Sequence, residues 1–138
     1  MEIKKEKDII YGVVDQRGEI ASVYVGIPYL DIGTRTDVFT NISKDKGMNM
    51  LIRSMGLSAI ATDEIGSKED FEAIENAMLA GVSLIFTMHG KTIEDVYKKT
   101  NIKNIINYFD YIILLSNKNG VGTIEKIHRI SSENMEVV

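Results

Sequence analysis

Residues 57–66 read LSAIATDEIG, an apolar run that ends in two adjacent carboxylates and a glycine. A short apolar run that stops at polar residues is typical of a buried strand that reaches the edge of a sheet. Asp63 and Glu64 repel each other, so a strand that carries both at its tip needs a cation, a proton or a functional reason to keep them there. The end of this strand is the first candidate for a functional site.

The segments around this strand predict an α/β fold. Two further apolar runs, at 8–15 and 82–88, have the length and composition of buried strands. Apolar residues recur at helical spacing over 43–56 and 67–81. Strands that are apolar throughout and alternate with amphipathic helices are expected in a mostly parallel sheet with helices on both faces.

Cap residues mark where the two helices begin and end. Ser43 is a candidate N-cap for the first helix, and Gly56 ends it. Ser67, with Asp70 three residues later, forms a capping-box pattern, and Gly81 ends the second helix.

The rest of the chain gives weaker signals. A third helix is predicted to begin at Thr92, and another to run over 101–106. Residues 18–26 are interpreted as a second strand after a turn, and residues 27–43, which show neither period and contain the only proline, as a loop. Residues 111–130 contain two β-rich runs joined by an Asn/Gly turn, which predicts a C-terminal hairpin.

Composition limits the classes of function. The 138 residues suit one domain, and 16 Lys and Arg against 20 Asp and Glu give a net charge of −4, so no nucleic-acid partner is expected. The lack of cysteine excludes disulfides and thiol chemistry and fits a reducing compartment. No apolar stretch approaches the roughly 18 residues that cross a bilayer. A cytoplasmic location is therefore expected.

Three polar residues are expected at one edge of the sheet. Asp15, Asp63 and His89 each follow a predicted strand, and open α/β sheets bind ligands outside the carboxyl ends of their strands. Polar residues also gather at strand ends because the chain reaches water there, and periodicity alone does not separate the two explanations. Taken by itself, His89 before a glycine is better explained by a hydrogen bond to a loop carbonyl.

The pair at the strand tip also has the form of a Walker B strand, in which apolar residues precede Asp-Glu. In that arrangement the aspartate, Asp63 here, holds Mg²⁺, because a hard dication with phosphate ligands prefers carboxylate oxygen. The glutamate, Glu64, orients or deprotonates the water that attacks the terminal phosphorus. A cation and a polarised water would relieve the repulsion between the two carboxylates.

Six ordered segments between about Ile9 and about Ile130 carry a family resemblance. They are GVVDQRGEIAS, DIGTRTDV, GMNMLIRSM, ATDEIG, EDFEAIENAMLAGVSLIFTMHG and IEDVYKK. Together they resemble the stage III sporulation protein AA family, motor ATPases related to type II and type IV secretion ATPases. The resemblance implies part of a RecA-like P-loop NTPase domain, with a mostly parallel sheet flanked by helices and a C-terminal β-hairpin.

The resemblance implies roles for five titratable residues. Asp63 and Glu64 match the Walker B acids, and His89 matches the histidine box that follows the next strand in secretion ATPases. Asp15 and Glu19 match the acidic box of the family. Glu64, His89 and Glu19 are therefore expected to be catalytic. Asp63 and Asp15 are expected to hold Mg²⁺, with Asp63 also part of the nucleotide site.

Three arginines are expected to contact the nucleotide phosphates. Arg17 lies between the two acidic-box residues. Arg35 and Arg53 fall where hexameric relatives carry arginines that reach a phosphate, including the phosphate of a neighbouring subunit. The acidic box of the family more usually reads Asp-Glu-Arg-Ser-Glu, so Gln16 and Gly18 depart from it, and position 16 receives no role.

A P-loop NTPase also needs G-x-x-x-x-G-K-S/T, whose backbone N–H groups and lysine cradle the phosphates. The sequence contains no such motif, because HGKT at 89–92 and KDKG at 44–47 lack the upstream glycine. We therefore expect residues 9–130 to be the C-terminal part of a longer ATPase domain, after a charged leader at 1–8 and before a tail at 131–138. The parent protein would bind ATP and Mg²⁺, whereas this fragment is expected to bind neither and to be inactive.

The resemblance further implies partners and a place of action. The parent is expected to be a hexamer at the cytoplasmic membrane face of the mother cell in a spore-forming bacterium, where it acts with an integral membrane protein of a channel to the forespore. This chain is also expected to self-associate. Two other classes stay open: a nucleotide-free α/β module that binds proteins, and a metal-dependent hydrolase or phosphoacceptor domain with Asp15, Asp63 and Glu64 as an acidic pocket.

Overall fold

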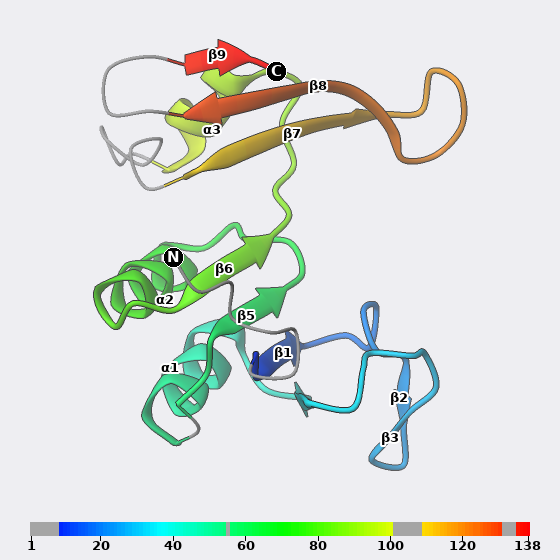
Figure 1. Cartoon of the computed structure of the whole chain (residues 1–138), viewed down its shortest axis with the longest axis vertical. Helices are drawn as coiled ribbons and strands as arrows, with labels where there is room; N and C mark the ends of the chain where they lie inside the picture. Colours follow the sequence, from blue (N-terminus) through cyan, green and yellow to red (C-terminus); the bar gives the residue numbers. More distant parts are fainter. Residues whose placement is uncertain (1–8, 55, 101–108, 131–134) are drawn as a thin grey trace. The chain divides into compact units, whose positions relative to one another are not determined.

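A computed structural model describes residues 9–54, 56–100, 109–130 and 135–138 of the chain. Contacts divide the chain into two compact units, Met1–Thr92 and Ile93–Val138 (Figure 1).

The first unit is built on a sheet of four parallel strands. In spatial order these are β4 (Thr36–Thr40), β1 (Tyr11–Asp15), β5 (Ala59–Thr62) and β6 (Ser83–Phe86). Helix α1 (Lys44–Ser54) connects β4 to β5, and helix α2 (Lys68–Leu79) connects β5 to β6. The predicted α/β fold, with a mostly parallel sheet flanked by helices, is confirmed.

Both helices begin and end where their cap residues predict. The hydroxyl of Ser67 accepts a 3.1 Å hydrogen bond from the backbone N–H of Asp70, whose carboxylate accepts one of 3.0 Å from the N–H of Ser67. Gly56 (φ 55°) and Gly81 (φ 75°) follow the two helices in the left-handed region that favours glycine. The chain can therefore turn directly from each helix into the next strand.

Helix α1 lies close to β1 because glycines leave room at the contact. A Cβ added at Gly12 would lie 2.8 Å from Leu51 Cδ1, and one added at Gly47 would lie 2.6 Å from Val14 Cγ1, which is closer than real Cβ atoms approach. Gly47 is three residues after Lys44. This contact therefore holds the first turn of α1 above the end of β1.

The two faces of the sheet differ in burial. Helices α1 and α2 pack against each other on one face of the sheet (Figure 1). Val14 and Ile60 point to this face and are fully buried. Ile85 points to the opposite face from edge strand β6 and is 65% exposed. Residues 82–88 were predicted to be buried throughout, under helices on both faces of the sheet. This prediction is wrong for the described part of this unit, because its helices cover one face only.

The segment between β1 and α1 also differs from the sequence prediction. Residues 18–26 contain only a two-residue strand, β2 (Val23–Tyr24), which pairs with β3 (Ile27–Pro28) in a separate antiparallel hairpin. Residues 27–43, interpreted as a loop, contain β3 and the edge strand β4. The sequence of β4, TDVFT, has no regular alternation of polar and apolar residues, so its pattern did not predict a strand.

The second unit contains one helix and a three-stranded antiparallel sheet. Helix α3 (Ile93–Thr100) precedes strands β7 (Tyr111–Ser116), β8 (Thr123–Ile130) and β9 (Met135–Val137), with β8 in the middle. The third helix and the C-terminal hairpin are confirmed, and β9 lies in the predicted tail.

The structure does not test several of the sequence predictions. The helix at 101–106 and the leader at 1–8 lie outside the described residues, and the predicted domain boundaries stay a prediction. In the part of the chain that the structure describes, no helix has both the length and the apolar character needed to cross a membrane.

Candidate functional site

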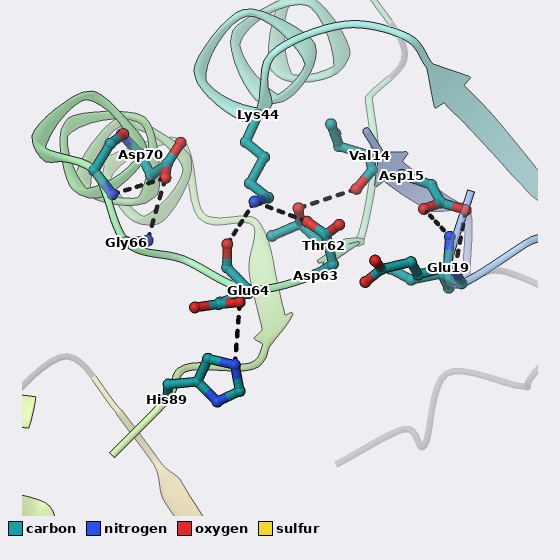
Figure 2. Close-up of polar contacts among 12 residues, drawn as sticks. Val14, Asp15, Glu19, Lys44, Thr62, Asp63, Glu64, Gly66, Asp70 and His89 are labelled. Atoms are coloured by element: carbon teal, nitrogen blue, oxygen red, sulfur yellow. Dashed lines mark hydrogen bonds and ion pairs between the residues drawn. The ribbon is translucent and has the colours of Figure 1, made fainter. Parts of the chain in front are cut away.

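The carboxyl ends of three parallel strands bring the predicted residues to one edge of the first unit (Figure 2). Val14 and Thr62 are register partners, and Thr62 Oγ1 donates a 3.0 Å hydrogen bond to the carbonyl of Val14. Asp15 and Asp63, the next residues along β1 and β5, therefore lie at neighbouring strand ends. His89 follows β6, the next strand along the same edge. The structure thus places Asp15, Asp63 and His89 together at this edge.

Asp15 is fully buried and bonds to the backbone of the loop that follows it. Its Oδ1 accepts a 2.8 Å hydrogen bond from the N–H of Glu19, and its Oδ2 accepts bonds of 3.0 Å and 2.8 Å from the N–H groups of Ile20 and Ala21. Three donors satisfy a carboxylate that would be costly to bury alone. Asp15 therefore shapes the loop that carries Arg17 and Glu19, while its predicted contact with Mg²⁺ stays a prediction.

Glu64 is held by a contact of its side chain with His89 and by a backbone hydrogen bond of the next residue, Ile65. Its Oε2 lies 3.3 Å from His89 Nε2. The N–H of Ile65 donates a 2.9 Å hydrogen bond to the carbonyl of Thr87, which ties the segment after β5 to the segment after β6. The Glu64 side chain is 48% exposed, so a water molecule has access to its carboxylate.

Lys44 is a residue of this site that sequence analysis missed. Its Nζ lies 3.0 Å from Asp63 Oδ1, and it also donates a hydrogen bond to the backbone carbonyl of Glu64 (Figure 2). The Lys44 and Asp63 side chains are only 13% and 8% exposed, so water shields this ion pair little. Lys44 could have been found as a cation in the first turn of the helix that follows β4 at this sheet edge. That inference requires β4, which the sequence pattern did not predict.

A small polar pocket surrounds the ion pair. Its volume is about 190 Å³, and its lining residues are Arg17, Glu19, Lys44, Asp63, Glu64, Gly66 and Asp70. Pockets that enclose a whole small-molecule ligand are typically about 300–1,000 Å³, so this one suits an ion together with one end of a ligand. Four carboxylates face two cations in the lining, which favours a positively charged occupant.

Two of the predicted phosphate ligands lie away from this pocket. Arg35 precedes β4, where its carbonyl accepts a 3.0 Å hydrogen bond from the N–H of Tyr11 at the amino end of β1. Arg53 is in the last turn of α1, which runs from the carboxyl edge of the sheet back to the amino edge. Of the three arginines, only Arg17 lines the pocket. Contact of Arg35 or Arg53 with a phosphate of a neighbouring subunit stays a prediction.

The chain matches one known protein family over most of its length. Residues 4–135 match the family model described as sporulation stage III, protein AA. The chain belongs to this family. The stage III sporulation protein AA of Bacillus subtilis (strain 168) is 40% identical over 119 residues, which are 85% of this chain and 39% of that relative. The resemblance inferred from the sequence is confirmed, and the chain spans less than half the length of the relative it matches.

Asp63 has a buried oxygen that the hydrogen bonds of the described residues leave unsatisfied. Its Oδ1 is buried and, within the described residues, has no hydrogen-bond partner, so its contact with Lys44 is an ion pair without hydrogen-bond alignment. The described residues contain no group of three or more His, Cys, Asp or Glu arranged to hold a metal ion. One carboxylate of this kind fits Mg²⁺, which is commonly bound by one or two carboxylates, waters and substrate phosphates. The alternative of an acidic pocket built from Asp15, Asp63 and Glu64 stays a hypothesis.

The first turn of α1 carries a further ionised group close to Lys44. A hydrogen bond from the Ser43 side chain lowers the pKa of Asp45, and the backbone N–H and ammonium of Lys46 act in the same direction against the opposing effect of burial. An ionised Asp45 complements the positive N-terminal end of α1. The turn that carries Lys44 is thereby stabilised at neutral pH.

Proposed function

We propose that this chain carries the metal-binding and water-positioning half of an ATPase that works in sporulation. The observation that carries the proposal is the pair at the carboxyl end of β5. Asp63 has a buried oxygen that no hydrogen bond satisfies, and Glu64 has an exposed carboxylate 3.3 Å from His89. The Walker B pattern supports ATP hydrolysis, and membership of the stage III AA family supports the role in sporulation.

The two carboxylates suit different tasks because their surroundings differ. Asp63 is desolvated and faces a cation, so it suits the ligation of Mg²⁺. When bound, Mg²⁺ neutralises charge on the phosphate oxygens. Glu64 faces solvent, so it suits the orientation of the attacking water and the acceptance of its proton. His89 acts as a positioning residue, because its Nε2 holds the Glu64 carboxylate.

Arg17 and Glu19 complete the rim of the pocket. Both lie on the loop after β1, whose backbone N–H groups donate hydrogen bonds to the buried Asp15 carboxylate. These hydrogen bonds hold the loop, and with it Arg17 and Glu19, in place. We assign Arg17 to a phosphate oxygen, because its guanidinium presents several donors in a plane. Glu19 is assigned as a second acceptor near the attacking water.

The cradle for the nucleotide belongs, in this proposal, to the part of the family protein outside this chain. A pocket of about 190 Å³ is too small for a whole nucleotide. We therefore assign the binding of Mg²⁺ together with ATP, a RecA-like P-loop fold and hexamer formation to the full-length protein, acting with an integral membrane partner at the mother-cell membrane. The chain alone is assigned no hydrolytic activity.

Glu64→Gln in the full-length protein tests the assignment of the water-positioning group. The amide is nearly isosteric but accepts no proton, so the rate of ATP hydrolysis should fall about 10²- to 10⁴-fold. The dissociation constant for Mg²⁺-ATP should stay within about threefold, since the phosphate ligands are unchanged. Glu69→Gln, an exposed change in the first turn of α2, is the control and should hydrolyse ATP like the wild type. A Glu64→Gln variant that is as active as this control contradicts the proposal.

A further inference from the structure

Lys44 occupies the oxygen that the proposed function assigns to a metal ion. Its Nζ lies 3.0 Å from Asp63 Oδ1, and it bonds the backbone carbonyl of Glu64 as well. The ammonium therefore touches both residues of the Walker B pair, as Figure 2 shows. The proposed function gives this lysine no role.

Packing, rather than a chance contact of a long surface side chain, determines where Lys44 lies. Its side chain is 13% exposed. The helical turn that carries it is held on β1 at Gly47, where an added Cβ would lie 2.6 Å from Val14 Cγ1. In such shielded surroundings the Coulomb attraction within an ion pair is stronger than on the surface, and removal of one partner leaves an uncompensated charge.

A divalent cation and the Lys44 ammonium compete for Asp63 Oδ1. The reason is charge, because two cations at contact distance from one buried oxygen repel each other strongly. Entry of a metal ion therefore requires the ammonium to leave. The displaced ammonium then needs another anionic partner, and an oxygen of a phosphate beside Arg17 is a suitable one.

We propose that Lys44 is the resident counter-ion of Asp63 and is exchanged for the metal ion when a phosphate arrives. This inference rests on the proposed function, because it takes Asp63 as the metal ligand. Lys44 is a positioning residue in the empty site and a phosphate contact in the loaded site. As a consequence, a metal ion alone binds weakly, whereas a metal ion accompanied by a phosphate compensates the displaced ammonium.

Binding of Mn²⁺ to this chain without nucleotide tests the exchange. Lys44→Met removes the ammonium and keeps an unbranched apolar side chain. Because the competing cation is gone and Asp63 is left uncompensated, the Mn²⁺ affinity, measured by electron paramagnetic resonance of unbound Mn²⁺, should rise about tenfold or more. Lys46→Met is the matched control, since it removes the same charge from an exposed position in the same helical turn, and it should change the affinity by less than about twofold.

A second measurement keeps the test independent of the stability of the variant. In the wild-type chain, chemical acylation of the Lys44 amine, followed by mass spectrometry, should quicken when Mn²⁺ is added and should not quicken with Na⁺ at the same ionic strength. In Asp63→Asn, added Mn²⁺ should not change the acylation rate of Lys44. An acylation rate in the wild type that saturating Mn²⁺ leaves unchanged overturns the exchange.

The outcomes separate this inference from the proposed function. If folded Lys44→Met binds Mn²⁺ no better than the wild type while Asp63→Asn weakens binding, the exchange is wrong and Asp63 remains the metal ligand. If Asp63→Asn leaves Mn²⁺ binding unchanged in both the wild-type and the Lys44→Met backgrounds, the metal role of Asp63 is wrong, and the exchange is wrong with it.

Discussion

At the scale of single residues, the chain separates two neighbouring carboxylates by giving them different surroundings. The Asp63 side chain is 8% exposed and that of Glu64 is 48% exposed. The buried Asp63 carboxylate has Lys44 as its cationic partner, whereas the exposed Glu64 carboxylate keeps its hydration. This difference removes the repulsion that two acids at one strand tip would otherwise cause, and it leaves Glu64 open to water.

The contact between Glu64 and His89 should matter for the rate of catalysis rather than for substrate binding. His89→Ala in the full-length protein should lower kcat about 10- to 100-fold, as commonly found for residues that orient an active group, because Glu64 loses its alignment. KM for ATP should stay within about threefold, since the residues assigned to the phosphates and the metal ion are unchanged. His89→Gln retains a donor and should restore part of kcat. Steady-state kinetics that show a higher KM with unchanged kcat for His89→Ala would contradict the positioning role.

At the scale of elements, the site depends on the connections that follow the strands. The loop after β1 is folded around the buried Asp15 carboxylate, and the first turn of α1 places Lys44 next to the segment after β5. Both connections are fixed by contacts with the sheet. The position of the Lys44 ammonium is therefore a property of how α1 packs on β1.

Gly47→Ala tests this packing in the isolated chain. Alanine favours a helix by about 1 kcal/mol over glycine, but its Cβ would lie 2.6 Å from Val14 Cγ1. Overpacking of a buried contact commonly costs about 1–3 kcal/mol, and so close an approach lies at the upper end of that range. After the helix gain is subtracted, the free energy of unfolding, measured in urea, should fall by about 1–2 kcal/mol. Gly66→Ala is the control, because no atom lies within 4 Å of its added Cβ, and it should change stability by less than about 0.5 kcal/mol. A Gly47→Ala chain that is as stable as the wild type would show that the contact relaxes freely.

Local signals explain which elements could be predicted from the sequence. The capping box of α2 and the glycine after each helix act within a few residues, so the helix bounds were predictable. Asp63, Glu64 and His89 were found because they follow strands with apolar character. Strand β4 owes its position to pairing with β1, which is distant in sequence, and Lys44 was missed because it depends on β4. The positions of Arg35 and Arg53 likewise follow from the sheet topology, which the sequence does not state.

At the scale of the whole molecule, the candidate site lies in one of the two compact units. All the residues to which the proposal gives a role at the metal ion, the attacking water or the phosphates lie within Met1–Thr92. They lie at the edge of a single sheet. The matched region is 39% of the Bacillus subtilis relative. The proposed cycle therefore needs the rest of the family protein for nucleotide binding, whereas the two cations' shared ligand, Asp63, and the displaced Lys44 both belong to this chain.

The Mg²⁺ dependence of ATP binding by the full-length protein tests the central claim most directly. In the wild type, Mg²⁺ should tighten ATP binding, because Asp63 holds the ion against the phosphates. Asp63→Asn should remove most of this tightening, since a neutral amide oxygen is a poorer ligand for a hard dication, and Glu64→Gln should keep it. Calorimetric titration of ATP with and without Mg²⁺ gives the ratio of dissociation constants for each protein. A ratio that is the same in the wild type and in Asp63→Asn would contradict the assignment of Asp63 as the metal ligand.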